Sequence, residues 1–342
     1  MKLKFLVKAI STGLLVGSTA MASAADYDLT MASTTPVASP WGKTLTSFQS
    51  LVKQYTDDQV NINASFGGAL GNDTQLLQKA QLGSTVQGAQ SSGANLGSVV
   101  HAFKSFDVPY IIKSIETSNK LFYPYGTLGG EAVDELQSLM AKKNLRLLYV
   151  MPFEFRGILT TDKKVQTPAD MQGLKIRVTP SEVERSMITE LGSGATTLGI
   201  SEVYTALQTG TVDGLAIPPA TAVAFGLHEV AGNMNLLNFQ PHGSFMTVNA
   251  RTWNKLPQDL QMKVQRAADD AVKQNAAFFE IELTNALEKF KAQGVNVITP
   301  TSAEQDAFTA IIQAPTTKIA TKDFNKDEKH FFETLKSTLD NI

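Results

Sequence analysis

The run Asp170-Met-Gln-Gly-Leu-Lys-Ile-Arg-Val-Thr-Pro180 decides how this chain is organised. Its apolar middle predicts a short buried strand, and Arg177 places a cation where that strand ends. A buried cation needs an anionic partner, so we expect something anionic to meet this arginine. A second run, from Ser201 to Gly214, predicts a short capped helix that leads through a glycine turn into a strand beginning at Val212.

The alternation of strand and helix extends from these two runs toward both ends of the chain. Toward the N-terminus the patterns predict strands at 27–32, 60–66, 86–91 and 146–150, and helices at 41–55, from 72 or 73 to 82, and at 131–143. Similar alternation continues from 156 to 249. Such a pattern is typical of α/β domains with largely parallel sheets.

One segment near the C-terminus breaks this alternation. From Pro257, a residue suited to the start of a helix, the pattern runs without a breaker to Gly294, a suitable C-terminal cap. A helix of some 37 residues would be about 55 Å long, which is more than one small domain requires. Its apolar spacing does not keep a strict heptad, so we prefer a helix that lies across two domains to a coiled coil.

The N-terminus has the composition of a secretory signal peptide. Lys2, Lys4 and Lys8 precede an apolar stretch, and Ala22-Ser-Ala24-Ala25 suits a cleavage site. We therefore assign residues 1–25 to a signal peptide, so the protein is expected in the periplasm. The apolar stretch is shorter than the about 20 residues that a spanning helix needs, so the mature protein is not expected to insert in the membrane.

Size and composition limit what the mature chain can be. About 317 residues would remain, more than one hydrophobic core usually supports, so two domains are expected. Loss of the three lysines changes the formal charge from −2 to −5, which argues against a nucleic-acid partner. The chain has no cysteine, which excludes disulfides and cysteine-based metal sites.

Motifs of common enzymes are missing from the sequence. There is no Gly-x-Ser-x-Gly elbow and no Gly-x-Gly-x-x-Gly fingerprint. The four histidines, which are His101, His228, His242 and His330, are not spaced as metal ligands. We therefore predict no cofactor, no metal and no catalytic residue. The main alternative to a protein without catalytic activity is a periplasmic enzyme acting on a small carboxylic acid, with Glu154, Asp213 or His242 as acid or base.

Together the runs around Arg177 and Val212 closely resemble the substrate-binding proteins of tripartite ATP-independent periplasmic (TRAP) transporters, in their dicarboxylate-type branch. The resemblance covers nearly the whole mature chain, and includes Phe66-Gly-Gly-Ala-Leu-Gly-Asn-Asp73 and Phe106-Asp-Val-Pro-Tyr110. It implies an α/β, two-domain periplasmic binding protein fold, with hinge strands and a long helix spanning both domains. Domain I would hold 26–151 plus 242–282, and domain II 152–241 plus 283–342.

The resemblance also implies a ligand and a partner. The arginine at the position of Arg177 holds the carboxylate of the transported solute in that family, and the position of Arg156 often carries an arginine that faces the ligand. A guanidinium grips a carboxylate through two parallel hydrogen bonds. The residues alone leave a second interpretation, in which either arginine pairs with a neighbouring Asp or Glu. The implied function is capture of a small organic acid between the domains, and its delivery to a TRAP membrane permease.

Other residues expected near the ligand have alternative roles. Hydroxyls at strand ends either contact the ligand or satisfy local backbone groups: Ser33, Thr34, Ser91 and Ser92. Trp41, at a helix start, either walls the pocket or packs in the core. Glu154 either pairs with Arg156 or binds a ligand hydroxyl.

One departure from the family pattern concerns the substrate. Family members that bind sugar acids often have Gln-Glu-Asn after Val-Asp-Gly, whereas this chain has Leu215-Ala216-Ile217 followed by two prolines. The change removes polar contacts and adds apolar surface. We therefore expect a carboxylate with few hydroxyls, whose body packs against apolar residues such as Trp41, Phe153, Ile217 or Phe245.

Overall fold

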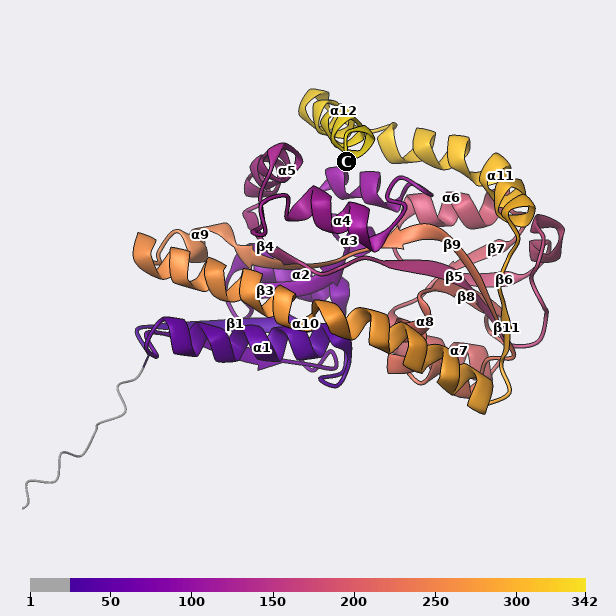
Figure 1. The fold of residues 1–342 in the computed structure, drawn as a ribbon, viewed down its shortest axis with the longest axis horizontal. Helices are drawn as coiled ribbons and strands as arrows, with labels where there is room; N and C mark the ends of the chain where they lie inside the picture. The colour runs from indigo at the N-terminus through magenta and orange to yellow at the C-terminus, as the bar shows by residue number, and fades with distance from the viewer. Residues whose placement is uncertain (1–24) are drawn as a thin grey trace, which may run out of the picture.

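The computed structural model describes residues 25–342, and it shows two lobes, each built around one β-sheet (Figure 1). The predicted signal peptide lies outside the described residues except for Ala25. The sheet of the first lobe has the strand order β2-β1-β3-β10-β4, with β2 at Val60–Ser65, β1 at Tyr27–Ser33, β3 at Gly88–Ser92, β10 at Ser244–Asn249 and β4 at Leu145–Val150. The sheet of the second lobe has the order β11-β9-β5-β8-β6-β7, with β11 at Asn296–Ile298, β9 at Asn233–His242, β5 at Glu154–Thr160, β8 at Gly214–Ile217, β6 at Lys175–Val178 and β7 at Gly194–Thr197.

Helices cover both faces of each sheet. Those of the first lobe are α1 (Pro40–Tyr55), α2 (Asp73–Leu82), α3 (Gly93–Leu96), the 3-10 helix η1 (His101–Asp107), α4 (Ile115–Phe122), α5 (Glu131–Ala141) and α9 (Ala250–Trp253). Those of the second lobe are η2 (Pro168–Met171), α6 (Glu182–Glu190), α7 (Ile200–Gln208), α8 (Pro219–Ala224) and η3 (Leu227–Glu229). The chain ends with α10 (Gln258–Ala292), α11 (Ser302–Thr321) and α12 (Lys326–Asp340).

The expectation of largely parallel sheets is confirmed, with one reversed strand in each sheet. β10 pairs antiparallel with β3 and β4, and β5 pairs antiparallel with β8 and β9. Both reversed strands follow a crossing from the other lobe, because β4 leads into β5 through 151–153 and β9 leads into β10 through Gly243. These crossings are the hinge strands that the family resemblance implies.

Gly243 is required where β9 crosses into β10. A Cβ atom added there would lie 2.3 Å from Cε1 of Phe153 and 2.8 Å from Cε2 of Phe245. Both rings belong to the hydrophobic core of the first lobe, so they cannot move aside easily. Only a residue without a side chain fits at this crossing.

The long helix predicted from Pro257 to Gly294 is confirmed as α10, with Pro257 as its N-cap and Gly294 at φ +77° just beyond its end. Its first two thirds pack along α1 and the first-lobe sheet, with Leu260, Val264 and Phe279 in the core of the first lobe. Near its C-terminal end, Phe290 lies in the core of the second lobe. α10 therefore spans both lobes, as Figure 1 shows.

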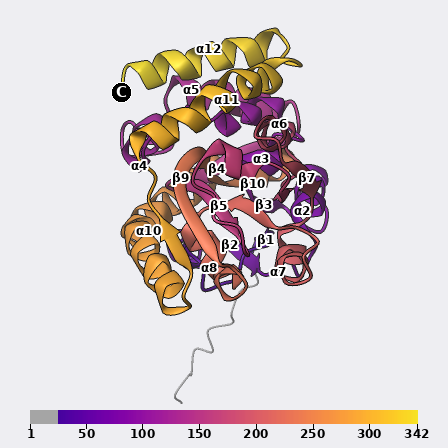
Figure 2. The ribbon, with the colours of Figure 1, turned by 90° about the vertical axis from the view of Figure 1, so that its right-hand side faces the viewer.

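The two C-terminal helices pack on different lobes. α11 packs on α6 of the second lobe, whereas α12 packs on α5 and α4 and places Phe331 and Leu335 in the core of the first lobe. Figure 2 shows α11 and α12 together on the side of the molecule opposite α10.

The domain boundaries stay a prediction. Within residues 25–342, the helices are all too short or too polar to cross a membrane.

Candidate ligand-binding site

A cavity of about 50 Å³ lies where the two lobes meet. Its walls come from the strand ends and helix starts of both sheets, which is where open α/β sheets bind ligands. The lining residues from the first lobe are Thr34, Thr35, Trp41, Asp73, Ser92 and Asn95. Those from the second lobe are Arg156, Arg177, Thr179, Ile200, Ile217, Pro218, Thr221, Phe225 and His242.

Arg177 lies in β6, between β7 and β8, and its side chain ends in the cavity. Its Nε atom donates to the carbonyl of Leu198 at 3.0 Å, and the residue is 6% exposed. Burial lowers the pKa of Arg177 to about 10, partly offset by Glu184, so it stays a cation at neutral pH. Among the residues that the structure describes, none accepts a hydrogen bond from its two terminal nitrogens, so both are available to a group in the cavity.

Arg156 also reaches the cavity, but the protein already uses part of its guanidinium. Nη1 donates to Oε1 of Glu184 and, at 3.1 Å, to the carbonyl of Ala216. The β5–β9 register shifts between Arg156 and Ile158, and Gly157 lets β9 approach closely, since an added Cβ would lie 2.0 Å from the carbonyl oxygen of Asn235. Such irregularities re-aim a side chain. Here Arg156 points toward the start of α6.

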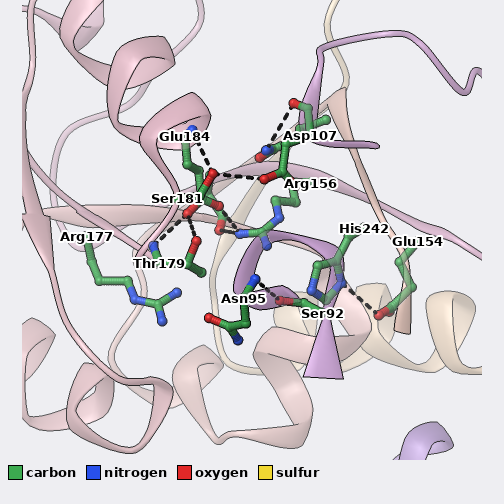
Figure 3. Close-up of polar contacts among 12 residues, drawn as sticks. Ser92, Asn95, Asp107, Glu154, Arg156, Arg177, Thr179, Ser181, Glu184 and His242 are labelled. Atoms are coloured by element: carbon green, nitrogen blue, oxygen red, sulfur yellow. Dashed lines mark hydrogen bonds and ion pairs between the residues drawn. The ribbon is translucent and has the colours of Figure 1, made fainter. Parts of the chain in front are cut away.

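Glu184 is the buried anion that contacts both Arg156 and Thr179 on this side of the cavity. It lies in the first turn of α6, where Ser181 is the N-cap, and its carboxylate accepts from the backbone and the hydroxyl of Thr179 (Figure 3). Burial would raise the pKa of Glu184, but Arg156 and Arg177 outweigh it and the pKa is lowered. The ion pair of Arg156 and Glu184 therefore leaves the charge of Arg177 as the net positive charge of the second lobe's wall.

The first lobe supplies hydrogen-bonding groups and one acid. Asp73 accepts from Oγ1 of Thr34 at 3.2 Å and from Oγ of Ser91 at 3.3 Å. Burial raises its pKa, although Thr34 and Arg177 act against this. Ser92 caps α3, where it accepts from the backbone of Asn95 at 3.3 Å.

Trp41 and His242 form the wall between the lobes. Their rings stack with centroids 5.3 Å apart. Behind His242, Glu154 accepts from Oγ1 of Thr221 at 2.7 Å. Its Oε2 lies 3.6 Å from Nδ1 of His242, a contact drawn in Figure 3. The pKa of His242 is lowered by burial and by Arg156.

The structure brings together six of the residues predicted for the site: Thr34, Trp41, Ser92, Arg156, Arg177 and Ile217. The other five lie outside the cavity lining. Ser33 bonds to Thr35 and Ser91 bonds to Asp73, while Glu154 lies behind His242. Phe153 and Phe245 are fully buried in an aromatic cluster of the first lobe, with Phe103, Phe106 and Phe122.

Several lining residues were missed by the sequence analysis. Asp73 was predicted only as a possible first residue of a helix; Asn72 is the N-cap, so the Asp73 carboxylate bonds instead to Thr34 and Ser91 at the cavity. Thr179 follows Arg177 by two residues at the same strand end, a signal that could have found it. Asn95, Thr221 and Phe225 have no distinguishing local pattern.

The residues proposed for the enzyme alternative do not all meet. Glu154 and His242 are neighbours, but Asp213 accepts from the backbone of Lys175 at 2.7 Å, at the start of β6 and away from the cavity lining. Within residues 25–342, His, Asp and Glu nowhere gather in a group that could hold a metal ion.

Asp107, the last residue of η1, hydrogen-bonds to Ser181, the N-cap of α6. Its carboxylate accepts from Oγ of Ser181 at 2.8 Å, and its carbonyl accepts from Nε2 of Gln240 at 3.3 Å. Burial and the nearby Glu184 raise the pKa of Asp107 to about 7. Near neutral pH this carboxyl is therefore partly protonated in the folded protein.

We expect the stability of the protein to depend on pH through Asp107. Folded Asp107 holds its proton up to about pH 7, whereas unfolded Asp107 loses it near its ordinary pKa of 3.8. The free energy of unfolding therefore falls as pH rises through this window, by on the order of 1 kcal/mol per pH unit. Asp107→Asn removes the titration, so calorimetry should show the variant gaining stability relative to wild type between pH 5 and pH 8. Asp134→Asn, exposed on α5, is the control; an equal difference between Asp107→Asn and wild type at both pH values would contradict the assignment.

Comparison with known proteins identifies the family. Residues 31–323 match the model of the bacterial extracellular solute-binding proteins, family 7, named DctP. The chain is 30% identical over 269 residues to the C4-dicarboxylate-binding periplasmic protein DctP of Rhodobacter capsulatus, covering 78% of each chain.

Solved structures agree in fold. A TRAP periplasmic solute-binding protein of Chromohalobacter salexigens, with bound D-glucuronate, has a TM-score of 0.83 at 25% identity, over 91% of this chain and 99% of that one. Another, from Desulfovibrio salexigens with bound orotic acid, has a TM-score of 0.86 at 22% identity, over 92% and 99%. The chain therefore belongs to the bacterial extracellular solute-binding proteins of family 7, the DctP family of TRAP solute-binding proteins.

Proposed function

We propose that this protein captures a small organic acid in the cavity between its lobes and delivers it to a TRAP membrane permease in the periplasm. The single observation that carries the proposal is Arg177, a buried cation whose terminal nitrogens have no acceptor in the described chain and lie at the cavity. A carboxylate satisfies both the charge and the two parallel donors of a guanidinium. Arg156 stands beside it as the second proposed contact.

The other walls favour an acid with few hydroxyls. Ile200, Ile217, Pro218 and Phe225 give the cavity an apolar side. Hydroxyls that found no partner there would each cost roughly 1 to 3 kcal/mol. Thr34, Ser92 and Asn95 offer partners on the opposite wall, so we propose that the ligand has its carboxylate at the second lobe and at most a few polar groups at the first.

The printed names of relatives support a carboxylate. The Rhodobacter capsulatus relative is named for C4-dicarboxylates, and the two structures compared above hold glucuronate and orotic acid. These ligands differ in shape and size, but each carries a carboxylate. The shared group is the one that we propose Arg177 binds.

The proposal also includes the export of the protein and the closure of its two domains. We propose that residues 1–25 are a cleaved signal peptide and that domain I (26–151 plus 242–282) and domain II (152–241 plus 283–342) close on the ligand. Within 283–342, α12 is an exception: because it packs in the core of the first lobe, we propose that it moves with domain I.

A single screen tests the proposal. Keto, hydroxy, dicarboxylic and aromatic acids, with glucuronate, sialic acid and the amide of each hit, are added to the purified protein. We expect the preferred acids to raise the melting temperature by mass action and to lower the radius of gyration in X-ray scattering, because the lobes close. Their amides should do neither. Binding of amides as tight as that of acids would overturn the proposal, and tighter binding of glucuronate than of small acids would overturn its specificity.

The same incubations separate binding from catalysis. A binding protein returns its acid unchanged, so mass spectrometry of the small molecules should recover the added acid alone. Conversion to a product would favour the enzyme alternative, with Glu154 and His242 as the neighbouring acid and base.

A further inference from the structure

Glu154 lies behind the cavity wall, yet its only close polar neighbours in the described chain are a wall hydroxyl and a wall imidazole. In the register of β5 and β9, Glu154 stands directly opposite His242. Its Oε2 accepts from Thr221 of α8 at 2.7 Å and lies 3.6 Å from Nδ1 of His242. The same carboxylate oxygen thus accepts from Thr221 and faces the imidazole of His242.

The imidazole of His242 is held in one orientation. It is 7% exposed, its ring stacks on Trp41, and it stands at the last position of β9. Nδ1 is buried without a hydrogen-bond partner in the described chain, and Glu154 is its neighbouring anion. Figure 3 shows the other ring nitrogen on the side away from Glu154. That nitrogen belongs to a ring that lines the cavity and receives no hydrogen bond from the described residues.

The location of the proton on His242 follows from electrostatics. A bare Nδ1 would turn its lone pair toward the carboxylate of Glu154, and two negative ends would face each other. A protonated Nδ1 turns an N–H toward that carboxylate instead. Charged groups near His242 are Arg156 and Glu154 on β5 and Glu184 on α6, with Asp73 and Arg177 across the cavity. Burial and Arg156 lower the pKa of His242, so the ring is neutral and carries one proton.

We propose that Glu154 is a positioning residue for specificity: it keeps the proton of His242 on Nδ1, so that bare Nε2 accepts a hydrogen bond from a hydroxyl of the bound acid. This inference rests on the proposed function, which it deepens by naming the ligand as a hydroxy acid. The carboxylate of the acid would go to Arg177 and its hydroxyl to His242. An acid of the same length without the hydroxyl leaves Nε2 unpartnered.

Nuclear magnetic resonance of the ligand-free protein tests the proton's location. Nitrogen-15 shifts of the histidine side chains, assigned with His242→Asn, should show Nε2 of His242 unprotonated and Nδ1 protonated at neutral pH. In Glu154→Gln the carboxylate is gone, so the share of the Nε2-protonated tautomer should rise, whereas Glu154→Asp should retain the wild-type tautomer. This measurement does not require a known ligand.

The chain offers a matched control at a second glutamate–histidine pair. Glu135 accepts from Oγ1 of Thr334 at 2.9 Å and lies 3.4 Å from Nε2 of His330, away from the cavity lining. Glu135→Gln repeats the chemistry of Glu154→Gln at that place. It should leave the shifts of His242 and the affinity for acids unchanged.

Calorimetry with malate and succinate tests the consequence for specificity. We expect wild type to prefer malate by about 3- to 10-fold, the usual contribution of one neutral hydrogen bond. Glu154→Gln should lose this preference and keep its affinity for succinate within about twofold. A proton on Nε2 in wild type, or an unchanged preference in Glu154→Gln, would overturn the inference. If neither acid nor any other carboxylate binds, the proposed function fails, while the shifts still decide where the proton lies.

Discussion

Arg177→Ala should weaken the binding of the preferred acid by about 30-fold to several-thousand-fold, while the protein stays folded. The loss of one partner from a buried, hydrogen-bonded charge pair costs about 2 to 5 kcal/mol of binding free energy. The stability of the ligand-free protein should change little, because the only acceptor of an Arg177 hydrogen bond in the described chain is the backbone carbonyl of Leu198. Calorimetry of binding and the melting temperature without ligand measure the two effects separately.

Two variants sharpen this test. Arg177→Lys keeps the charge but loses the two parallel donors of the guanidinium, so it should also bind the acid markedly more weakly than wild type. Arg185→Ala removes an exposed arginine of α6 that bonds to the carbonyl of Ala195, and it should change affinity little. If Arg177→Ala changed affinity by less than about threefold, the proposed carboxylate contact would be wrong.

Glu184→Ala should have the largest effect on stability. The carboxylate of Glu184 accepts from both the backbone and the hydroxyl of Thr179, and it is the ion-pair partner of Arg156. Removing it leaves Arg156 buried without its counter-charge, and breaking a buried ion pair in this way costs about 3 to 5 kcal/mol. Chemical denaturation of ligand-free protein should show this loss.

A neighbouring glutamate provides the control for Glu184→Ala. Glu182, on the same turn of α6, is itself exposed, and it makes ion pairs with the exposed Lys322 and with the largely buried Lys104. Pairs of an exposed carboxylate contribute about 0 to 1 kcal/mol, and Lys104 keeps Asp323 as a second neighbouring anion, so Glu182→Ala should be close to wild type. Glu184→Gln should fall between the two, because its amide oxygen still accepts from Thr179. Equal stability of Glu184→Ala and Glu182→Ala would refute the role assigned to Glu184.

The helices and strands could be predicted from the sequence because its strongest signals are local and periodic, whereas the two-domain arrangement with hinge strands was implied by the family resemblance. The strand predicted at 27–32 became β1 (Tyr27–Ser33), and the helix predicted from Trp41 to Tyr55 became α1, one residue longer at Pro40. Pro257 and Gly294 flank α10 as their backbone preferences suggested. The reversal of β5 and β10 was beyond local patterns, since strand direction depends on which lobe the chain has just left.

The candidate site was less predictable because its residues meet only through the tertiary fold. Arg177 and Trp41 stand at element ends that the patterns could locate. Phe153 and Phe245 had the right chemistry for a pocket, but an aromatic cluster with Phe103, Phe106 and Phe122 buries them in the core of the first lobe. Glu184 is invisible in the sequence as a partner of Arg156, because 28 residues separate them.

The two crossings between the sheets differ in length, and this difference bears on the mechanics of the molecule. Three residues link β4 to β5, whereas Gly243 alone links β9 to β10. A fully extended chain spans about 3.3 to 3.6 Å per residue, so a three-residue link can accommodate a wider range of end-to-end distances than a one-residue link. Rotation of the lobes should therefore pivot close to Gly243. His242, adjacent to this pivot, lines the cavity. Because the cavity lies close to this pivot, a small displacement at the ligand would accompany a large displacement at the distant ends of the lobes.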